Sequence, residues 1–341
     1  MNDSFHESQL NSLFEYSIVI YHHISGIIFL IVNVLVFLLI ANDNDNRNKN
    51  YRKYLMMLQG FSTLTDLMLS VGVPIMIVNF RIIYAIGFIP FNVRMTTCMI
   101  IFVISFGEVI NCYFSCVYYR RNIILPDDAR FRYTGWSKLY LLLGIRIVGF
   151  VVYSIIYFLL LQIDTPIEEI PPSALWIQSK TSSILLKVDW HLYVLAFVML
   201  GWGMPLFTVM SLIVRELSHE LKHGMINASS STKRYQRRAV TSLLLQGIVP
   251  GIVYILPILS EFAILLYSTI AGSNSISPRI ISMISAILFN LFSLHTFVHS
   301  ITIFACTPSY RRWIIGIITR RKVPSPSTYF IKVSELTHKV P

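Results

Sequence analysis

The sequence predicts an all-α membrane protein with a bundle of seven transmembrane helices. Seven apolar stretches alternate with short polar loops, and the Lys and Arg residues gather in every second loop. The composition is 55% hydrophobic and only 13% charged, about half the charge of a typical soluble domain. At a rise of ~1.5 Å per residue, ~20 apolar residues in a helix span the ~30 Å hydrocarbon layer. Helix is favoured because backbone groups in lipid must find partners within their own segment.

The predicted helices follow one another with little intervening chain. They cover residues 17–40, 54–80, 93–118, 138–162, 191–214, 237–267 and 279–306. Residues 1–16 are expected to form an extracellular tail, and 17–306 the bundle. Beyond the last span, apolar residues at helical spacing between arginines predict a short amphipathic helix over 307–322 on the inner leaflet. The polar segment 323–341 is expected to be a disordered cytoplasmic tail.

Prolines and one long loop are expected to shape the bundle. Pro74, Pro205, Pro250 and Pro257 lie within predicted spans, where each removes a backbone hydrogen bond and can kink its helix. The sixth span is the longest, and its basic inner end suggests a kinked lever. Prolines are also common in membrane helices generally. The loop 163–190 is expected to be irregular or partly strand-like and to cap the outer mouth.

The distribution of cations predicts the orientation. The loops 41–53, 119–138 and 215–238 together with the C-terminal tail hold 22 Lys and Arg residues, whereas the other loops and the N-terminal tail hold five. Cytoplasmic segments carry such an excess, so the N-terminus is expected outside the cell membrane and the C-terminus inside. The formal net charge of +11 is explained by this rule, and no nucleic-acid partner is predicted.

The sequence lacks the short motifs of the common enzyme classes. It contains no His-Glu-x-x-His run, no Gly-rich phosphate loop, no nucleophile elbow and no Cys-x-x-Cys pair. We therefore expect no catalytic activity, no metal and no cofactor. Cys98 stands near the outer end of the third span, but the long outer loop holds no cysteine, so no disulfide is expected there.

Two groups of polar residues lie inside predicted spans, where ionisable side chains are costly and usually face the bundle interior. Glu108 and Arg146 lie at similar depths in adjacent helices, which predicts an ion pair. A second group is expected to connect three helices through Asp66, Asn33, Asn290 and His295. Such a network either holds two helix arrangements close in energy or simply joins the helices.

Several stretches together resemble the nematode serpentine chemoreceptors of class H or class I. The first is Tyr51-Arg52-Lys53-Tyr54-Leu55, followed by Ser62-Thr63-Leu64-Thr65-Asp66 and Pro74. The second is Tyr118-Tyr119-Arg120-Arg121, and the third is His295 followed by Pro308-Ser309-Tyr310-Arg311. The likeness runs from about residue 14 to 313. Ser309 splits the family's Pro-Tyr-Arg motif, and Arg121 stands where the family commonly has His.

The resemblance implies a G protein-coupled receptor that senses small chemicals in sensory neurons, with sensory cilia as the expected location. A small odorant-like or pheromone-like ligand, a heterotrimeric G protein and the bilayer are the implied partners. Coupling is assigned to residues of the inner ends, namely Tyr119, Arg120, Arg121, Lys233, Arg237, Arg238, Tyr310 and Arg311. Aromatic and ionisable residues of the outer halves are candidates for the ligand pocket, namely Trp190, His191, Tyr193, Tyr254, Glu261 and Tyr267.

The alternative function is a transporter or channel for a small solute. Its support is the interruption at Pro250-Gly251 and Pro257, because broken helices often mark substrate sites. A transporter built from repeats should show a matching interruption in its other half, and the sequence shows none. An odd number of spans also fits poorly with two equal halves.

Overall fold

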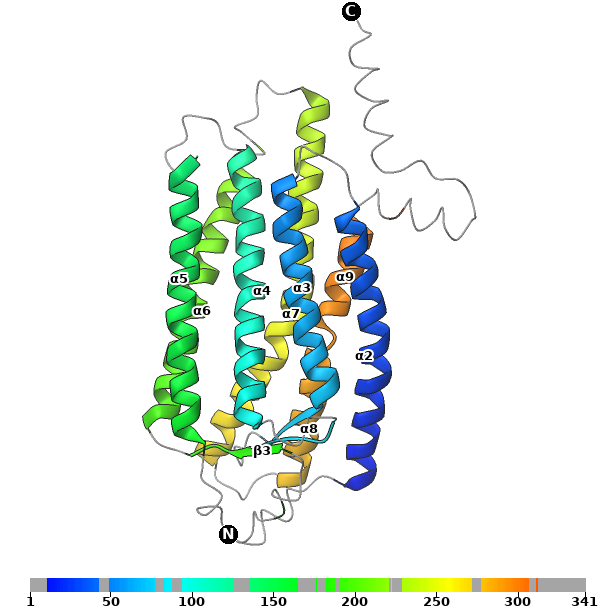
Figure 1. Ribbon diagram of the computed structural model, residues 1–341, viewed down its shortest axis with the longest axis vertical. Helices are drawn as coiled ribbons and strands as arrows, with labels where there is room; N and C mark the ends of the chain where they lie inside the picture. Colours follow the sequence, from blue (N-terminus) through cyan, green and yellow to red (C-terminus); the bar gives the residue numbers. More distant parts are fainter. Residues whose placement is uncertain are drawn as a thin grey trace, which may run out of the picture.

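The computed structural model describes residues 11–42, 49–77, 82–87, 94–124, 135–164, 176, 182–187, 190–220, 222, 229–271, 277–306 and 311. Within these residues, long α-helices form a bundle with a small sheet at one end (Figure 1). The helices are α2 (Ser12–Ala41), α3 (Lys49–Gly72), α4 (Met95–Ile124), α5 (Gly135–Ile163), α6 (Trp190–His219), α7 (Ser230–Ala271), α8 (Pro278–Phe292) and α9 (His295–Cys306). The predicted helical class is confirmed. The predicted helix over 307–322 and the tail 323–341 lie outside the described residues, except for Arg311.

Helix α4 is the centre of the bundle. It packs against α3, α5, α6 and α7, while α2 packs against α3 and α9 on the far side (Figure 1). Small residues allow other helices to approach α4 closely. Its buried small side chains are Ser105, Cys112, Ser115 and Cys116.

The outer surface of the bundle is apolar, as expected for a multi-pass membrane protein. Four helical segments of the described chain are long and apolar enough to cross a membrane, namely Ser12–Ala41, Met95–Tyr119, Tyr140–Ile163 and Arg279–Cys306. Large apolar side chains point outward from them, including Phe150 at 71% exposure and Ile27 at 63%. These side chains would be unfavourable in water and meet lipid instead.

The first helix begins before the predicted span. Helix α2 starts at Ser12, because Asn11 caps it: its side-chain oxygen accepts a hydrogen bond from the Leu13 N–H at 3.1 Å. This bond satisfies one of the free donors at a helix start. The residues assigned by sequence to the end of the extracellular tail therefore belong to the helix.

The second helix ends earlier than predicted. The predicted span runs to residue 80, but α3 stops at Gly72 and Pro74 begins a strand instead of kinking a helix. Proline disfavours helical geometry in the residue before it. That residue, Val73, has a φ of 41° and is fully buried, a backbone conformation that β-branched residues rarely adopt. Hydrogen bonds hold it there, from Val73 N to Leu69 O at 2.9 Å and from Ile86 N to Val73 O at 3.3 Å.

Three short strands form an antiparallel sheet across one end of the bundle (Figure 1). They are β1 (Pro74–Ile77), β2 (Ile82–Ala85) and β3 (Ser182–Leu185), with β2 in the centre. Pro74 pairs with Ala85, and Ala85 pairs with Ser182. The partly strand-like loop predicted after the fourth span is thus confirmed at β3, where it covers this end of the bundle. The central strand is buried along its whole length.

The seventh predicted span is broken, which corrects the expectation of one continuous helix. Helix α8 ends at Phe292, and α9 begins at His295. At the turn between them, the Ser293 hydroxyl donates to the Asn290 carbonyl at 2.7 Å, and Leu294 N bonds to Leu291 O at 3.1 Å. A serine hydroxyl that takes a helix carbonyl competes with the backbone ladder and bends helices.

The sixth predicted span is longer than expected and is not interrupted. Helix α7 runs from Ser230 to Ala271 and includes both Pro250 and Pro257. The interruption that supported a transporter is therefore absent from the secondary structure of this helix. In the same way, α6 continues through Pro205 to His219, beyond the predicted end at residue 214.

Candidate functional site

A buried polar network connects α2, α3 and α9. Asn33 donates to Asp66 Oδ2 at 3.0 Å, and its own side-chain oxygen accepts from Gln59 at 3.1 Å and from Ser300 at 2.7 Å. Gln59 also donates to the Ser300 hydroxyl at 3.1 Å. All four side chains are at most 5% exposed. The predicted association of Asn33 with Asp66 is confirmed, whereas Gln59 and Ser300 were not predicted.

His295 reaches this region through its neighbour. Its ring nitrogens lie 3.0 Å from the Phe292 carbonyl and 2.9 Å from the Thr296 hydroxyl. That hydroxyl is 3.4 Å from the Ser62 carbonyl of α3. His295 thus reaches the second span by way of Thr296, and its predicted association with Asp66 stays a prediction. The backbone carbonyl of Asn290, by contrast, accepts from the Ser293 hydroxyl at the α8–α9 turn, and the Asn290 side chain interacts with His22 of α2.

The predicted ion pair between α4 and α5 is present. Arg146 donates to Glu108 Oε2 at 2.6 Å. Asn111 donates both to Glu108 Oε1 and to the Tyr153 hydroxyl, each at 3.1 Å. The Glu108 side chain is 13% exposed, and that of Arg146 is 36% exposed. Every charge in the pair therefore has a partner at membrane depth, which favours a structural role.

A second ion pair joins the ends of α4 and α6 that lie opposite the sheet. Arg121 contacts Glu216 through two hydrogen bonds, from Nε to Oε2 at 2.6 Å and from Nη2 to Oε1 at 2.9 Å. The Arg121 side chain is 5% exposed and that of Glu216 is 37% exposed. Such two-point geometry is the strongest form of this interaction. Sequence reasoning named Arg121 but missed Glu216, which follows the fifth predicted span by two residues.

The other residues predicted for G protein coupling fall into three groups: one that packs against another helix, several that are exposed, and several that lie outside the described residues. Tyr119 stacks on Tyr51 of α3 with ring centres 6.1 Å apart. Arg237 and Arg238 are exposed near the start of α7, and Arg311 is exposed. Outside the described residues lie Tyr310 and the side chains of Arg120 and Lys233.

The residues predicted for the ligand pocket are not brought together in the described part of the chain. Trp190 and Tyr193 are 63% and 67% exposed at the start of α6, and His191 contacts Trp190 at 3.8 Å between ring centres. Glu261 instead faces α8, where its Oε2 accepts from Ser285 at 2.8 Å. The side chains of Tyr254 and Tyr267 lie outside the described residues. The ligand-binding role of this set stays a prediction.

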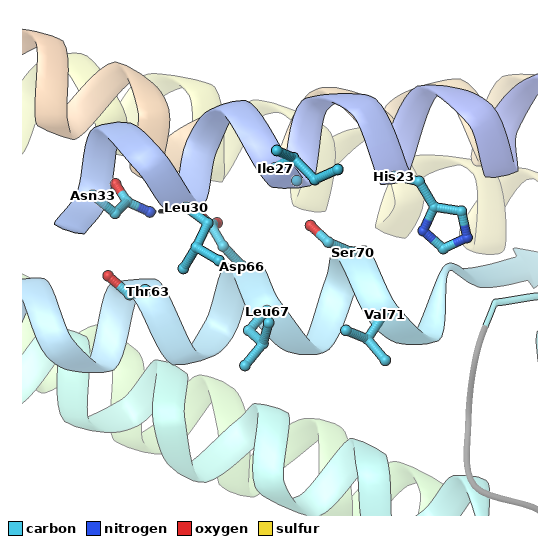
Figure 2. Close-up of a pocket in the computed structure, with 10 residues that line it drawn as sticks. His23, Ile27, Leu30, Asn33, Thr63, Asp66, Leu67, Ser70 and Val71 are labelled. Atoms are coloured by element: carbon cyan, nitrogen blue, oxygen red, sulfur yellow. Dashed lines mark hydrogen bonds between the residues drawn. The ribbon is translucent and has the colours of Figure 1, made fainter. Parts of the chain in front are cut away.

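A groove that sequence reasoning missed lies between α2 and α3. It has a volume of about 250 Å³, and Asp66 and Asn33 line it together with apolar side chains such as Ile27 and Leu67 (Figure 2). No sequence signal points to it, because it depends on how far apart two neighbouring helices pack. The lining of the groove combines a carboxylate with apolar side chains. Sites for small organic molecules usually have such a lining.

Comparison with known families gives one match of nearly full length. Residues 14–314 match the family model described as serpentine type 7TM GPCR chemoreceptor Sri. A search of curated proteins finds no match. The matched range contains α3 to α9 and nearly all of α2, so the likeness suggested by separate short motifs holds over the whole helical bundle.

Proposed function

The chain belongs to the Sri family of serpentine 7TM GPCR chemoreceptors, and on this premise we propose that it binds a small external chemical and activates a heterotrimeric G protein. The family is one of receptors rather than of enzymes. The ligand binds from outside the cell, and the G protein binds at the basic, cytoplasmic ends of the helices. Sensory cilia are the proposed location.

The Arg121–Glu216 pair is the observation that carries the proposal. It joins α4 and α6 at the ends that bear the cytoplasmic cations, and its arginine is almost fully buried. A two-point pair in such a place holds the two helix ends together. Separation of the helices would release a guanidinium at the surface where a G protein is proposed to bind. The pair therefore favours the inactive arrangement.

In this proposal α9 is the helix that shifts between the inactive and the active arrangement, and the network around Asn33 and the turn between α8 and α9 allow it to do so. Asn33, Gln59 and Ser300 exchange hydrogen bonds across three helices, so a shift of α9 can rearrange donors without leaving them unpaired. The turn at Ser293 separates α9 from α8 and gives α9 freedom to shift. A ligand biases such an equilibrium only if it binds one arrangement more tightly.

The test is the basal nucleotide exchange of a purified heterotrimeric G protein with receptor variants in lipid nanodiscs. Glu216→Gln keeps the shape of the side chain but removes its charge, and we expect basal exchange to rise about fivefold or more, the usual lower range of coupling between two states. The matched control is Glu220→Gln, which makes the same change about one turn further along the chain. The Glu220 carboxylate has its Oε1 3.9 Å from Nδ1 of His219 and is not part of the pair with Arg121.

A charge swap completes the test. Arg121→Glu combined with Glu216→Arg restores opposite charges at the two positions, and we expect basal exchange to fall back toward the wild-type level. Wild-type exchange in a well-folded Glu216→Gln variant would contradict the role given to the pair. The same exchange in both the Glu216 and Glu220 variants would contradict it equally.

A further inference from the structure

The groove between α2 and α3 opens toward the bilayer. Its walls are apolar side chains that point outward, with Ile27 63% exposed and Leu30 and Leu67 each 41% exposed. These three line the same side of the two helices (Figure 2). In a membrane they face lipid, so a molecule dissolved in the bilayer reaches the groove without passing through water.

Two close contacts between α2 and α3 lie along the groove, which extends from His23 and Val71 to Asn33 and Thr63. Gly26 meets Ser70 so closely that an added Cβ would lie 2.5 Å from the Ser70 side chain. Asn33 donates to Asp66 at 3.0 Å. Asn33 follows Gly26 by seven residues, a rise of about 10 Å along the helix. The two helices are thus in direct contact at two places along the groove.

The floor of the groove carries a carboxylate with spare hydrogen-bonding capacity. Asp66 is 5% exposed, and its Oδ2 accepts from Asn33. The Thr296 side chain of α9 also interacts with this carboxylate, while Oδ1 is buried and makes no direct hydrogen bond among the described residues. A buried acceptor without a donor is unfavourable, and more so at membrane depth. Leu30 lines the groove beside Asp66 and is 41% exposed, so a turn of this side chain toward lipid meets little protein (Figure 2).

We propose that this groove binds a small amphiphile that arrives through the bilayer. Its short alkyl body lies between Ile27 and Leu67, and its hydrogen-bond-donating head group reaches Asp66 Oδ1 once Leu30 has turned away. The chemical class is a short-chain alcohol or a molecule with an equivalent donor. This site is separate from the residues at the start of α6, and its binding is measured without a G protein, so the two proposals can fail separately.

The binding test uses a diazirine-bearing analogue of n-octanol on the purified receptor in lipid nanodiscs. After illumination, labelled peptides are identified by mass spectrometry. We expect labels on α2 and α3, which unlabelled n-octanol removes. Methyl octyl ether has a similar alkyl chain but no donor, and we expect it to compete about tenfold less well, as a hydrogen bond to a charged group contributes that much or more.

Two tryptophan variants separate the groove from ordinary lipid contact. Leu67→Trp fills the groove and should abolish the competed label. Leu64→Trp makes the same change on the same helix at a residue that is also exposed but does not line the groove, and should leave the label unchanged. Equal labelling of the two variants would show a lipid-contact surface only and overturn the proposal.

The Asp66→Asn variant tests the head-group contact without filling the groove. It keeps the size of the side chain and removes the carboxylate. We expect the advantage of n-octanol over the ether to fall severalfold while labelling persists, because the amide oxygen accepts a weaker hydrogen bond than a carboxylate. An undiminished preference for the alcohol, or equal competition by alcohol and ether in the wild type, would overturn the role of Asp66. Melting curves of each variant confirm that it is folded.

Discussion

Glu108 and Arg146 place two opposite charges inside the bundle, and each depends on the other. Arg146→Leu removes the 2.6 Å contact and leaves a largely buried carboxylate without its cation. Removal of one partner from a buried pair costs about 3 kcal/mol or more. We expect a lower melting temperature in detergent and less receptor at the cell surface, measured by thermal unfolding and by surface labelling of a tagged chain.

The double variant with Glu108→Leu and Arg146→Leu is the control for this prediction. It removes both charges, so neither is left unpaired, and replacement of a buried pair by apolar residues is often neutral. We expect surface levels to recover most of the loss. Wild-type levels in the single variant would mean that Glu108 finds another partner or is readily protonated.

Gly247 permits a close contact between α7 and the centre of the bundle. The Tyr113 hydroxyl of α4 donates to the Leu243 carbonyl at 3.0 Å, and a Cβ added at Gly247 would collide with that hydroxyl. Gly247→Ala should therefore displace Tyr113 and lower the stability by about 1–3 kcal/mol, the usual range for overpacking.

The matched control for Gly247→Ala lies one turn further along the same helix. A Cβ at Gly251 meets no atom within 4 Å, so Gly251→Ala should be neutral or slightly stabilising, because alanine is the better helix former. Thermal unfolding of both variants compares them directly. Equal melting temperatures would show that Tyr113 moves aside easily.

Charged partners inside the bundle could be predicted from the sequence, whereas neutral polar partners could not. Glu108 and Arg146 could be paired in advance, because a charge inside an apolar span requires an opposite charge at the same depth. Gln59, Ser300 and Asn111 could not be assigned, because neutral polar side chains carry no such requirement. Their partners depend on the rotation of each helix about its axis, which emerges only from packing.

Among the elements, the sheet and the first helix are joined by a hydrogen bond as well as by apolar packing around Ile18. The Tyr84 hydroxyl of β2 donates to Glu15 of α2 at 2.7 Å, and its ring packs edge-on against Trp176 at 5.7 Å between ring centres. Burial, with the Glu15 carboxylate beside it, raises the pKa of the Tyr84 hydroxyl above its ordinary value. The hydroxyl therefore stays protonated and donates at neutral pH.

Tyr84→Phe should loosen the attachment of the sheet while keeping its packing. We expect a loss of about 1 kcal/mol and faster hydrogen exchange of the β2 amides. Tyr16→Phe is the control, because Tyr16 is 66% exposed on α2. Because the folded-state pKa is raised, the contribution of Tyr84 is complete below about pH 10 and is lost as the pH rises above it. Unchanged exchange in Tyr84→Phe would contradict the attachment.

Helix boundaries were predictable where a residue type dictates them. Pro74 carries a signal against helix in the residue before it, and reading it that way would have ended the second helix in the right place. The break at Ser293 has no comparable signal, because serine occurs within many membrane helices. Pro250 and Pro257 show the converse, since α7 contains both and continues. Whether a helix tolerates a proline depends on its neighbours.

At the scale of the whole molecule, two independent patterns should agree on orientation. Successive spans run in opposite directions, with α8 and α9 following one another as the last span (Figure 1). The sheet lies at the end where α4 begins, and the Arg121–Glu216 pair lies near the opposite ends of α4 and α6. The basic loops of the sequence connect the helix ends on the side of that pair. From the positive-inside rule we expect the sheet to be extracellular and the pair cytoplasmic. The sequence predicted this division of the loops, and the sheet itself was expected only in part.

Cysteine labelling on whole cells tests this orientation. Lys187→Cys adds a thiol beside β3, and Arg237→Cys adds one near the start of α7; both positions are exposed. A membrane-impermeant maleimide should label the first in intact cells and the second only after permeabilisation, with the unsubstituted chain as background. The 22 cations on one side make the reverse orientation unfavourable, because cationic segments stay in the cytoplasm. Labelling of both thiols in intact cells would contradict the orientation predicted from the charges. It would also contradict the coupling role of Arg121, which requires a cytoplasmic location.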